Sequence, residues 1–349
     1  MDLHELVMAT ISQIDKEETE NVIPPLEIVE EEEEDDGSSS TTTQFLSKKE
    51  TLLKIKNIRA IASDVDGTLL AKDQSIHPRT LSAIQRAIIE SSSSSERPLQ
   101  YFFPATGKSR KGAFDSLGPD IASLLLNTPG VFIQGLYCVD ANNKVVFERK
   151  LSSDAIAVAE DLAQQYNISI VAYDGDDLYS TEITEIVEHL HTFYGEPMPQ
   201  LLYSEEGVVT TIKLANHEPC MHKLLLMDND TEKLNTLVRP KLESLASQYG
   251  ATVTQALPTM LEWLPAGCSK ALGVSKLCEH LGIDPTTQLL ALGDAENDVG
   301  MLEMACIGVA MGNGCDRAKG AADFVTEESN CEGGAGVAME LFGFGGTTL

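Results

Sequence analysis

Two carboxylates stand two residues apart directly after a short apolar run. The run covers residues 58–63 and leads into Asp64, Val65 and Asp66. Such a run is typical of a buried strand in a parallel sheet, and residues i and i+2 of a strand project to the same side. Both carboxylates are therefore predicted to lie at the carboxyl end of the strand, where open α/β sheets bind ligands, with Gly67 favouring a sharp turn. The alternative is an ordinary charged turn, which Asp-Gly pairs often form.

Three later segments carry polar groups that could complete a site with this pair. Thr106, Gly107 and Lys108 follow an apolar run, and they offer a hydroxyl, a flexible turn and a cation. Lys270 opens a helical pattern for which Ser269 is the expected N-cap. The last segment follows the apolar run 289–292 and contains three polar side chains: Asp294, Asn297 and Asp298. Each segment is a weak signal alone, because Thr-Gly turns and solvated lysines at helix starts are common.

Four aspartates that converge at one sheet edge would repel one another. Two like charges 4 Å apart cost about 4 kcal/mol at an effective dielectric constant of about 20. The cluster therefore needs a hard cation, and oxygen ligands without clustered histidines or cysteines favour Mg²⁺ over zinc. Lys270 would neutralise the charge that the metal leaves. A carboxylate nucleophile, a second carboxylate, Mg²⁺, a lysine and a hydroxyl donor together indicate phosphoryl transfer.

The elements that must position these residues alternate along the chain from about residue 51. Strands are predicted at 58–63, 99–104, 131–133, 208–214, 289–292 and 307–310, and helices at 78–90, 154–166, 232–249, 269–281 and 296–305. This alternation favours βα units and a parallel sheet. Turn signals at 142–144 and 173–177 interrupt the pattern, so residues 111–264 are predicted to form an inserted α+β domain with an antiparallel sheet.

Composition limits the partners that the protein can have. The 349 residues carry a net charge of −29, and residues 1–50 hold 15 acidic and 3 basic side chains, as expected of a disordered tail. The sequence identifies no partner for this tail, and the absence of a basic patch argues against nucleic acid and anionic membranes. Seven scattered cysteines without a C-x-x-C pair, no membrane-spanning stretch and no signal peptide predict a cytoplasmic protein.

Four motifs, taken in order, resemble those of the haloacid dehalogenase (HAD) superfamily. They are residues 64–70, residues 106–108, Lys270 and residues 293–298. The spacing is similar to that of the Cof-type branch, whose large α/β cap lies between the second and third motifs. The resemblance covers about residues 56–342 and implies a Rossmann-like, doubly wound parallel sheet with an inserted cap. It divides the chain into a tail (1–50), a catalytic core (51–110 and 265–349) and a cap (111–264).

The resemblance also implies a phosphatase mechanism with a role for each motif. Asp64 would attack phosphorus and become an aspartyl phosphate, while Asp66 would protonate the leaving oxygen and then deprotonate water. The expected Mg²⁺ ligands are Asp64, the backbone carbonyl of Asp66, and Asp294, with Asp298 in support. The expected residues for binding substrate are Thr106, Gly107, Lys108, Lys270 and Asn297. Asp66 also argues against dehalogenation, which in this family does without the second aspartate.

Departures from the family pattern leave the substrate open. Lys108 stands where arginine is frequent, and Gln134 stands where asparagine is common. The expected function is a Mg²⁺-dependent phosphatase acting on a small phosphorylated metabolite, either a sugar phosphate or a nucleotide or cofactor phosphate. A hexose phosphate mutase of the phosphomannomutase type shares the Asp-x-Asp pair and is the first alternative. A non-catalytic binding protein on the same fold is the second.

Overall fold

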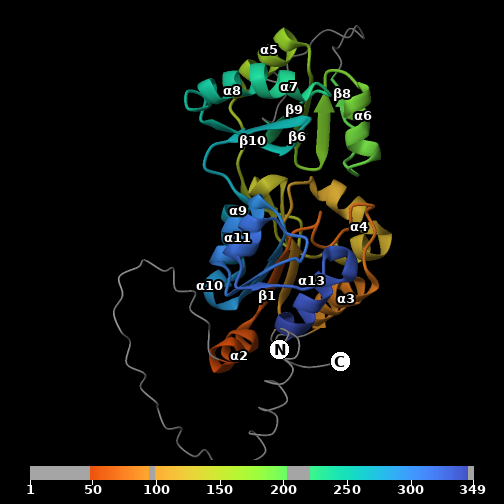
Figure 1. Ribbon diagram of the computed structural model, residues 1–349, viewed down its shortest axis with the longest axis vertical. Helices are drawn as coiled ribbons and strands as arrows, with labels where there is room; N and C mark the ends of the chain where they lie inside the picture. Colours follow the sequence, from red (N-terminus) through yellow and green to blue (C-terminus); the bar gives the residue numbers. More distant parts are fainter. Residues whose placement is uncertain (1–47, 94–98, 203–220, 345–349) are drawn as a thin grey trace, which may run out of the picture.

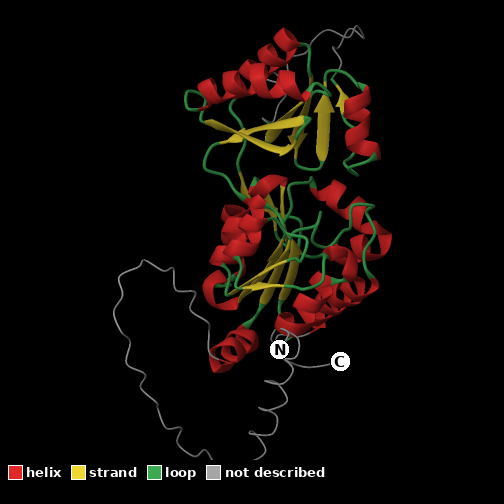
Figure 2. Cartoon of the chain, viewed as in Figure 1, coloured by secondary structure: helices red, strands yellow, loops and turns green. Residues whose placement is uncertain are grey.

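The computed structural model describes residues 48–93, 99–202 and 221–344. The predicted strand 208–214 lies outside these ranges, as does the predicted tail except for residues 48–50, which begin helix α2 (Lys48–Asn57). Two units are stacked along the long axis of the molecule, one built on a parallel sheet and the other on a mostly antiparallel sheet (Figures 1 and 2). Within the described residues, no helix is long and apolar enough to cross a membrane.

The first unit is built on a five-stranded parallel sheet of order β14-β13-β12-β1-β2. Its strands are β1 (Ala60–Ser63), β2 (Tyr101–Pro104), β12 (Leu289–Gly293), β13 (Ile307–Ala310) and β14 (Phe324–Val325). Ser63, the last residue of β1, pairs with Pro104 on one side and with Leu292 on the other. The loops that follow β1, β2 and β12 therefore leave the sheet at the same edge. This arrangement confirms the predicted Rossmann-like fold.

Helices cover both faces of the parallel sheet (Figure 2). On one face lie α3 (Pro78–Ser93), α4 (Arg110–Leu125), η5 (Asn330–Glu332), α13 (Gly334–Ala338) and η6 (Met339–Gly343). On the other lie α9 (Lys270–Leu281), α10 (Pro285–Gln288), η4 (Glu296–Asp298), α11 (Val299–Met304) and α12 (Asp316–Ala321). Side chains of β1 alternate between the two layers, with Ile61 in one buried cluster and Ala60 and Ala62 in the other.

A small three-stranded sheet extends this unit at the β2 side. It consists of β3 (Gly130–Phe132), β4 (Tyr137–Val139) and β5 (Val145–Glu148), with η1 (Ile133–Gly135) between β3 and β4. A parallel bridge between Ala105 and Val131 joins it to the loop after β2. Residues 110–139 thus contribute to the clusters that pack on the parallel sheet. We therefore propose that the inserted unit begins near Leu151, later than the predicted boundary at 111.

The second unit has a six-stranded sheet of order β10-β11-β9-β6-β7-β8, in which only β7 and β8 run parallel. The strands are β6 (Ser169–Asp174), β7 (Asp177–Ser180), β8 (Gln200–Leu201), β9 (Lys223–Met227), β10 (Ala251–Leu257) and β11 (Met260–Pro265). The predicted turns at 142–144 and 173–177 are the β4–β5 and β6–β7 hairpins. The fold is therefore α/β with an α+β insertion, as predicted.

Helices on the outer face bury one side of this sheet, and its other side looks toward the first unit (Figure 1). The outer layer contains α5 (Ser153–Tyr166), α7 (Thr231–Lys233), a π-helical turn η3 (Leu234–Val238) and α8 (Arg239–Ala246), and α6 (Glu185–Thr192) lies at one edge. The predicted single helix 232–249 is thus interrupted. Pro240 near the start of α8 explains this, because it has no N–H to continue the α-helical pattern.

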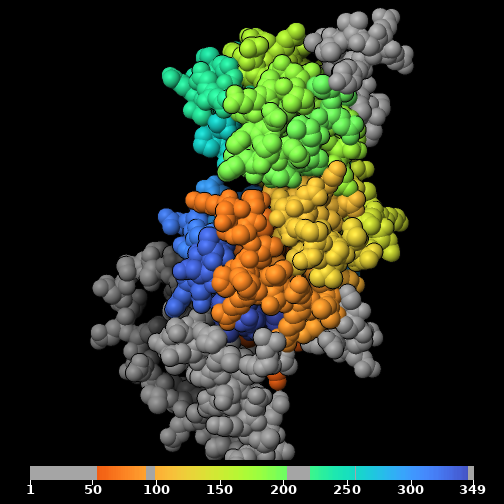
Figure 3. Space-filling model, turned by 90° about the vertical axis from the view of Figure 1, so that its right-hand side faces the viewer, coloured from red at the N-terminus to blue at the C-terminus, as the bar shows by residue number. Residues whose placement is uncertain are grey.

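The two units meet across a shared apolar cluster. Phe132 and Ile133 of the first unit pack in it with Tyr173 and Leu225 of the second. The space-filling view shows the second unit seated directly on the first, with residues near α6 facing α4 and the loop before α3 (Figure 3). The inner face of the inserted sheet therefore closes over the edge at which the parallel strands end.

Candidate active site

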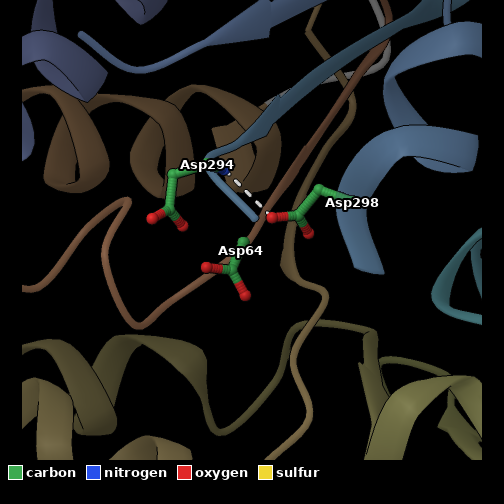
Figure 4. Close-up of side chains that lie close together, drawn as sticks. All are labelled: Asp64, Asp294 and Asp298. Atoms are coloured by element: carbon green, nitrogen blue, oxygen red, sulfur yellow. Dashed lines mark hydrogen bonds between the residues drawn. The ribbon is translucent and has the colours of Figure 1, made fainter. Parts of the chain in front are cut away.

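Three acidic side chains meet at the carboxyl edge of the parallel sheet. Asp64 follows β1, Asp294 follows β12, and Asp298 ends η4 (Figure 4). One carboxylate oxygen of each lies within 4.8 Å of those of the other two. Asp64 is 6% exposed and Asp298 is fully buried. The edge predicted from the strand pattern thus brings together carboxylates more than 200 residues apart.

Lys270, the first residue of α9, is buried between two of these carboxylates. Its Nζ donates to Asp64 Oδ1 at 2.7 Å and to Asp298 Oδ1 at 2.6 Å. Ser269 caps the helix as predicted, since its side chain accepts from the N–H of Leu272. Burial alone would lower the pKa of Lys270, but Asp298 and Asp64 raise it. The lysine is therefore a fixed cation in this site.

One lysine cation does not balance the charge of three carboxylates, and burial shifts the pKa of two of them. Burial raises the pKa of Asp64 well above its ordinary value, Lys270 opposes the shift, and Asp298 and Asp294 add to it. Burial and then Asp298 raise the pKa of Asp294 to about 6. A divalent cation would stabilise the charged form of these carboxylates, and its donors here would all be oxygens. The residues present therefore fit Mg²⁺.

Asp298 is held by Lys270 on one oxygen and by backbone N–H groups on the other. Its Oδ2 accepts from the backbone N–H groups of Asp294 and Ala295, each at 3.0 Å, while Oδ1 accepts from Lys270. These bonds fix the loop after β12. The geometry suits the supporting role that the sequence predicted for Asp298.

Asp66 does not join the cluster that the sequence predicted for four aspartates. Its side chain is 43% exposed, and Oδ1 pairs with Lys108 Nζ at 2.9 Å. β1 ends at Ser63, so the alternation of a strand does not extend to Asp66. Gly67, with φ of 86°, turns the chain there, and a Cβ at this position would collide with the Asp294 carboxylate. Asp66 therefore lies beside the cluster of Asp64, Asp294 and Asp298, on the side of Lys108.

The loop after β2 places the predicted hydroxyl and cation at the same edge. Thr106 is 1% exposed and Lys108 is 8% exposed. Lys108 Nζ also donates to Ser116 Oγ at 2.8 Å, so the cation is held from the side of α4. Gly107 lies so close to the Gln134 side chain that a Cβ would come within 2.7 Å of Gln134 Nε2. This contact explains a glycine at position 107.

A strained loop brings Gln134 into the site, which the sequence did not predict. Ile133 and Gln134 have φ angles of 51° and 58°, and this region is unfavourable for a β-branched residue such as isoleucine. Backbone bonds to the loop after β2 hold them there, from Ile133 N to Lys108 O and from Gln134 N to Thr106 O. Asn297 Nδ2 then donates to Gln134 Oε1 at 3.0 Å. Gln134 thus links the β2 loop to η4.

Two further residues orient Asp294 and were not among the predicted site residues. Thr68 Oγ1 donates to Asp294 Oδ1 at 3.2 Å, and Asn313 Nδ2 donates to Oδ2 at 3.4 Å. Asn313 also donates to the carbonyl of Gly67 at 2.9 Å. Thr68 belongs to the motif 64–70, which was the available signal for it, whereas Asn313 lies just after the predicted strand 307–310 and outside the four motifs.

The inserted unit contributes buried charges that no local pattern had indicated. Lys223 Nζ donates to Gly107 O at 3.0 Å and to Glu262 Oε1 at 2.8 Å. Glu196 is 3% exposed and accepts from Ser109 Oγ at 2.6 Å and from Ser109 N at 3.2 Å, where α4 begins. These bonds fasten the inserted unit to the loop after β2.

We expect Glu196 to make stability depend on pH. Burial raises its pKa, and the bonds from Ser109 and the charge of Lys223 oppose this. The folded protein therefore keeps the Glu196 proton to higher pH than the unfolded chain, so stability falls as pH rises above the ordinary glutamate value of 4.5. The free energy of unfolding of the native protein, relative to Glu196→Gln, should decrease through this window in urea titrations.

The control for this prediction is Glu185→Gln, which changes an exposed glutamate at the start of α6. This variant should lose stability relative to Glu196→Gln over the same pH range, as the native protein does. A native protein that gained stability relative to Glu196→Gln as pH rose would contradict the assignment.

Comparison with known proteins gives a consistent result. Residues 61–341 match the family model of haloacid dehalogenase-like hydrolases. Over 290 residues the chain is 33% identical to "Endoribonuclease YBEY, chloroplastic" of Arabidopsis thaliana, which covers 81% of this chain but 46% of that protein. The chain thus spans about half the length of this relative.

Two other matches cover nearly the whole of the related protein. The chain is 26% identical over 283 residues to the 5-amino-6-(5-phospho-D-ribitylamino)uracil phosphatase YcsE of Bacillus subtilis, covering 81% of this chain and 95% of that protein. A HAD/COF-like hydrolase of Plasmodium vivax has a similar fold, with a TM-score of 0.70 and 24% identity over 84% of this chain and 98% of the other.

Proposed function

The chain belongs to the haloacid dehalogenase-like hydrolases, as a phosphatase of the Cof type, and we propose that it hydrolyses a small phosphorylated metabolite with Mg²⁺ through an aspartyl phosphate. The single observation that supports this most is the buried Lys270, which bonds Asp64 and Asp298 beside Asp294. A buried, unbalanced carboxylate cluster of this kind is costly to stability and suits a site that binds charge.

Mg²⁺ would be held by Asp64, Asp294 and the backbone carbonyl of Asp66, with Asp298 positioning the loop. When bound, the metal would neutralise phosphoryl oxygens and the excess carboxylate charge. Thr106 and Lys270 would bind further phosphoryl oxygens, and Gly107, Lys108 and Asn297 would line the substrate site. Thr68 and Asn313 would keep Asp294 in place.

The side chains of the first motif would divide the reaction between them. An Asp64 carboxylate oxygen would form a bond to phosphorus while the bond from phosphorus to the ester oxygen breaks. Asp66, held by Lys108, would give its proton to that leaving oxygen. In the second half, Asp66 would take a proton from the water that attacks phosphorus, and the bond to Asp64 would break to release phosphate.

A panel of phosphomonoesters tests this function. With Mg²⁺ the protein should release inorganic phosphate from at least one substrate, lose that activity in EDTA and regain it when Mg²⁺ is added back. The panel should include the uracil phosphate that YcsE is named for, besides sugar phosphates, FMN and pyridoxal phosphate. ³¹P NMR would distinguish hydrolysis from the isomerisation that a mutase performs.

The metal requirement has its own measurement. Mg²⁺ should raise the midpoint of thermal unfolding, because a ligand that binds only the folded state stabilises it. Asp294→Asn should remove most of this increase, whereas Asp120→Asn on the exposed part of α4 should leave it unchanged. A protein that binds Mg²⁺ but releases no phosphate from any ester in the panel would contradict the proposed function.

A further inference from the structure

The cavity above Asp64 has a volume of about 490 Å³, enough for a small metabolite. Its floor contains Asp64, Asp66, Thr106 and Lys108. The inserted unit forms the opposite wall, and most side chains of that wall are apolar or aromatic: Tyr173, Leu190, Phe193, Tyr194, Leu225, Leu257 and Met260. The polarity of this wall limits which leaving groups the cavity can bind.

The charged groups on this wall are already paired with protein atoms. Lys223 bonds Gly107 O and Glu262, and Glu262 Oε2 also accepts from Thr254 Oγ1 at 2.7 Å. Glu196 is held by Ser109. A sugar with many hydroxyl groups would have to compete with these bonds, since buried polar groups left without partners cost stability. The wall therefore offers a polyol few open hydrogen-bonding groups.

Phe193 and Tyr194 offer a different kind of contact. Phe193 is 54% exposed although one face of its ring stacks on His189, with ring centres 4.9 Å apart. The Tyr194 ring meets Phe193 edge to face at 5.0 Å. Among the described parts of the chain, the Tyr194 hydroxyl has no hydrogen-bond partner. A planar group placed here would find an aromatic surface and one available hydroxyl.

These two rings line the same cavity as Asp66 and Lys108. Gly195 follows Tyr194 directly, and a Cβ at Gly195 would lie 3.9 Å from Lys108 Nζ. Lys108 in turn pairs with Asp66, the proposed donor of a proton to the leaving oxygen. The part of the substrate beyond that oxygen would therefore share the cavity with Phe193 and Tyr194.

We propose that the leaving group of the substrate carries a planar aromatic or heteroaromatic ring, which packs on Phe193 and hydrogen-bonds Tyr194. This inference rests on the proposed phosphatase function and selects nucleotide or cofactor phosphates over hexose phosphates. Phe193 and Tyr194 then determine specificity and take no part in the chemical step.

Kinetics with paired substrates tests this inference. The native enzyme should have a higher kcat/KM for ring-bearing esters, such as FMN and pyridoxal phosphate, than for glucose 6-phosphate. Phe193→Ala should lower kcat/KM for the preferred ring-bearing ester about tenfold, as expected for the loss of one aromatic contact, and should change glucose 6-phosphate hydrolysis little. Phe193→Tyr keeps an aromatic ring at this position and should retain the preference for ring-bearing esters. Leu237→Ala truncates an exposed apolar side chain outside the cavity and should alter neither rate.

The outcomes separate this inference from the proposed function. If glucose 6-phosphate is the better substrate, or if Phe193→Ala lowers both rates equally, the enzyme is a phosphatase but the ring preference is wrong. If no ester releases phosphate, the proposed function fails and this inference fails with it. Unchanged thermal unfolding of Phe193→Ala would show that a lowered rate is not a loss of folded protein.

Discussion

Replacing Asp64 by asparagine is expected to abolish phosphate release while leaving the fold at least as stable as before. Asparagine keeps a carbonyl oxygen that can accept from Lys270, but it cannot form the aspartyl phosphate. The loss should be at least about 10³-fold, since removal of a covalent nucleophile can cost about 10⁶-fold in kcat. Phosphate release from the best substrate of the panel, measured at saturating Mg²⁺, gives the result.

The stability of this variant follows from the raised pKa of Asp64. Burial makes the charged carboxylate unfavourable, so the folded state holds the proton to higher pH than the unfolded chain. In EDTA the native protein should therefore lose stability as pH rises above the ordinary aspartate value of 3.8, and the advantage of Asp64→Asn should widen. Urea unfolding of both proteins across this pH range measures the difference in their free energies of unfolding.

Asp120→Asn, an exposed change on α4, is the control and should affect neither activity nor stability. An Asp64→Asn protein that kept more than a tenth of the native rate would contradict the role of Asp64 as nucleophile. A variant that loses activity but keeps its stability shows that Asp64 serves function and does not stabilise the fold.

Replacing Lys270 by methionine should be the most destabilising single change in the site. Methionine fills a similar volume, but it leaves Asp64 and Asp298 buried without their cation. Removing one partner of a buried ion pair typically costs about 3–5 kcal/mol, and the free energy of unfolding in EDTA should fall by about that amount. Phosphate release should be lost as well, because Lys270 is proposed to bind the phosphoryl group.

Mg²⁺ should restore part of the stability of Lys270→Met, since it neutralises the same carboxylates, but should not restore activity. Lys276 lies on the same helix and forms an exposed pair with Glu279, so Lys276→Met is the matched control and should change stability little. A Lys270→Met protein as stable as the native one in EDTA would show that the carboxylates do not depend on this lysine.

Local patterns in the sequence were sufficient for the strand ends and for the helix that presents Lys270. β1, β12 and β13 lie within a few residues of the predicted strands, and Ser269 caps α9 as expected. Helix α4 was not predicted, because Gly118 and Pro119 inside it are signals for a break, and the helix indeed has a kink with φ of 80° at Gly118. Packing of α4 on the parallel sheet outweighs these local signals.

The position of Asp66 shows the limit of a strand-based argument. The alternation of side chains applies within a strand, and β1 ends before Asp64. Beyond that point the turn at Gly67 and the ion pair with Lys108 decide where the carboxylate lies. The turn at Gly67 and the ion-pair partner Lys108 belong to two different loops. The two-residue spacing of Asp64 and Asp66 therefore could not determine where the Asp66 carboxylate lies.

The sequence by itself determined the family, through four motifs that resemble those of the HAD superfamily. It also placed the catalytic candidates together, because parallel strands end at one edge and carry their polar residues there. Only the tertiary structure decided what faces that edge. Lys223 and Glu262 reach the site from the inserted sheet, and Phe193, Tyr194 and Glu196 reach it from the loop after α6. Their positions depend on how two separately packed units meet. That arrangement is set by contacts between residues far apart in the chain, so no periodic pattern or motif spacing in the sequence indicates it.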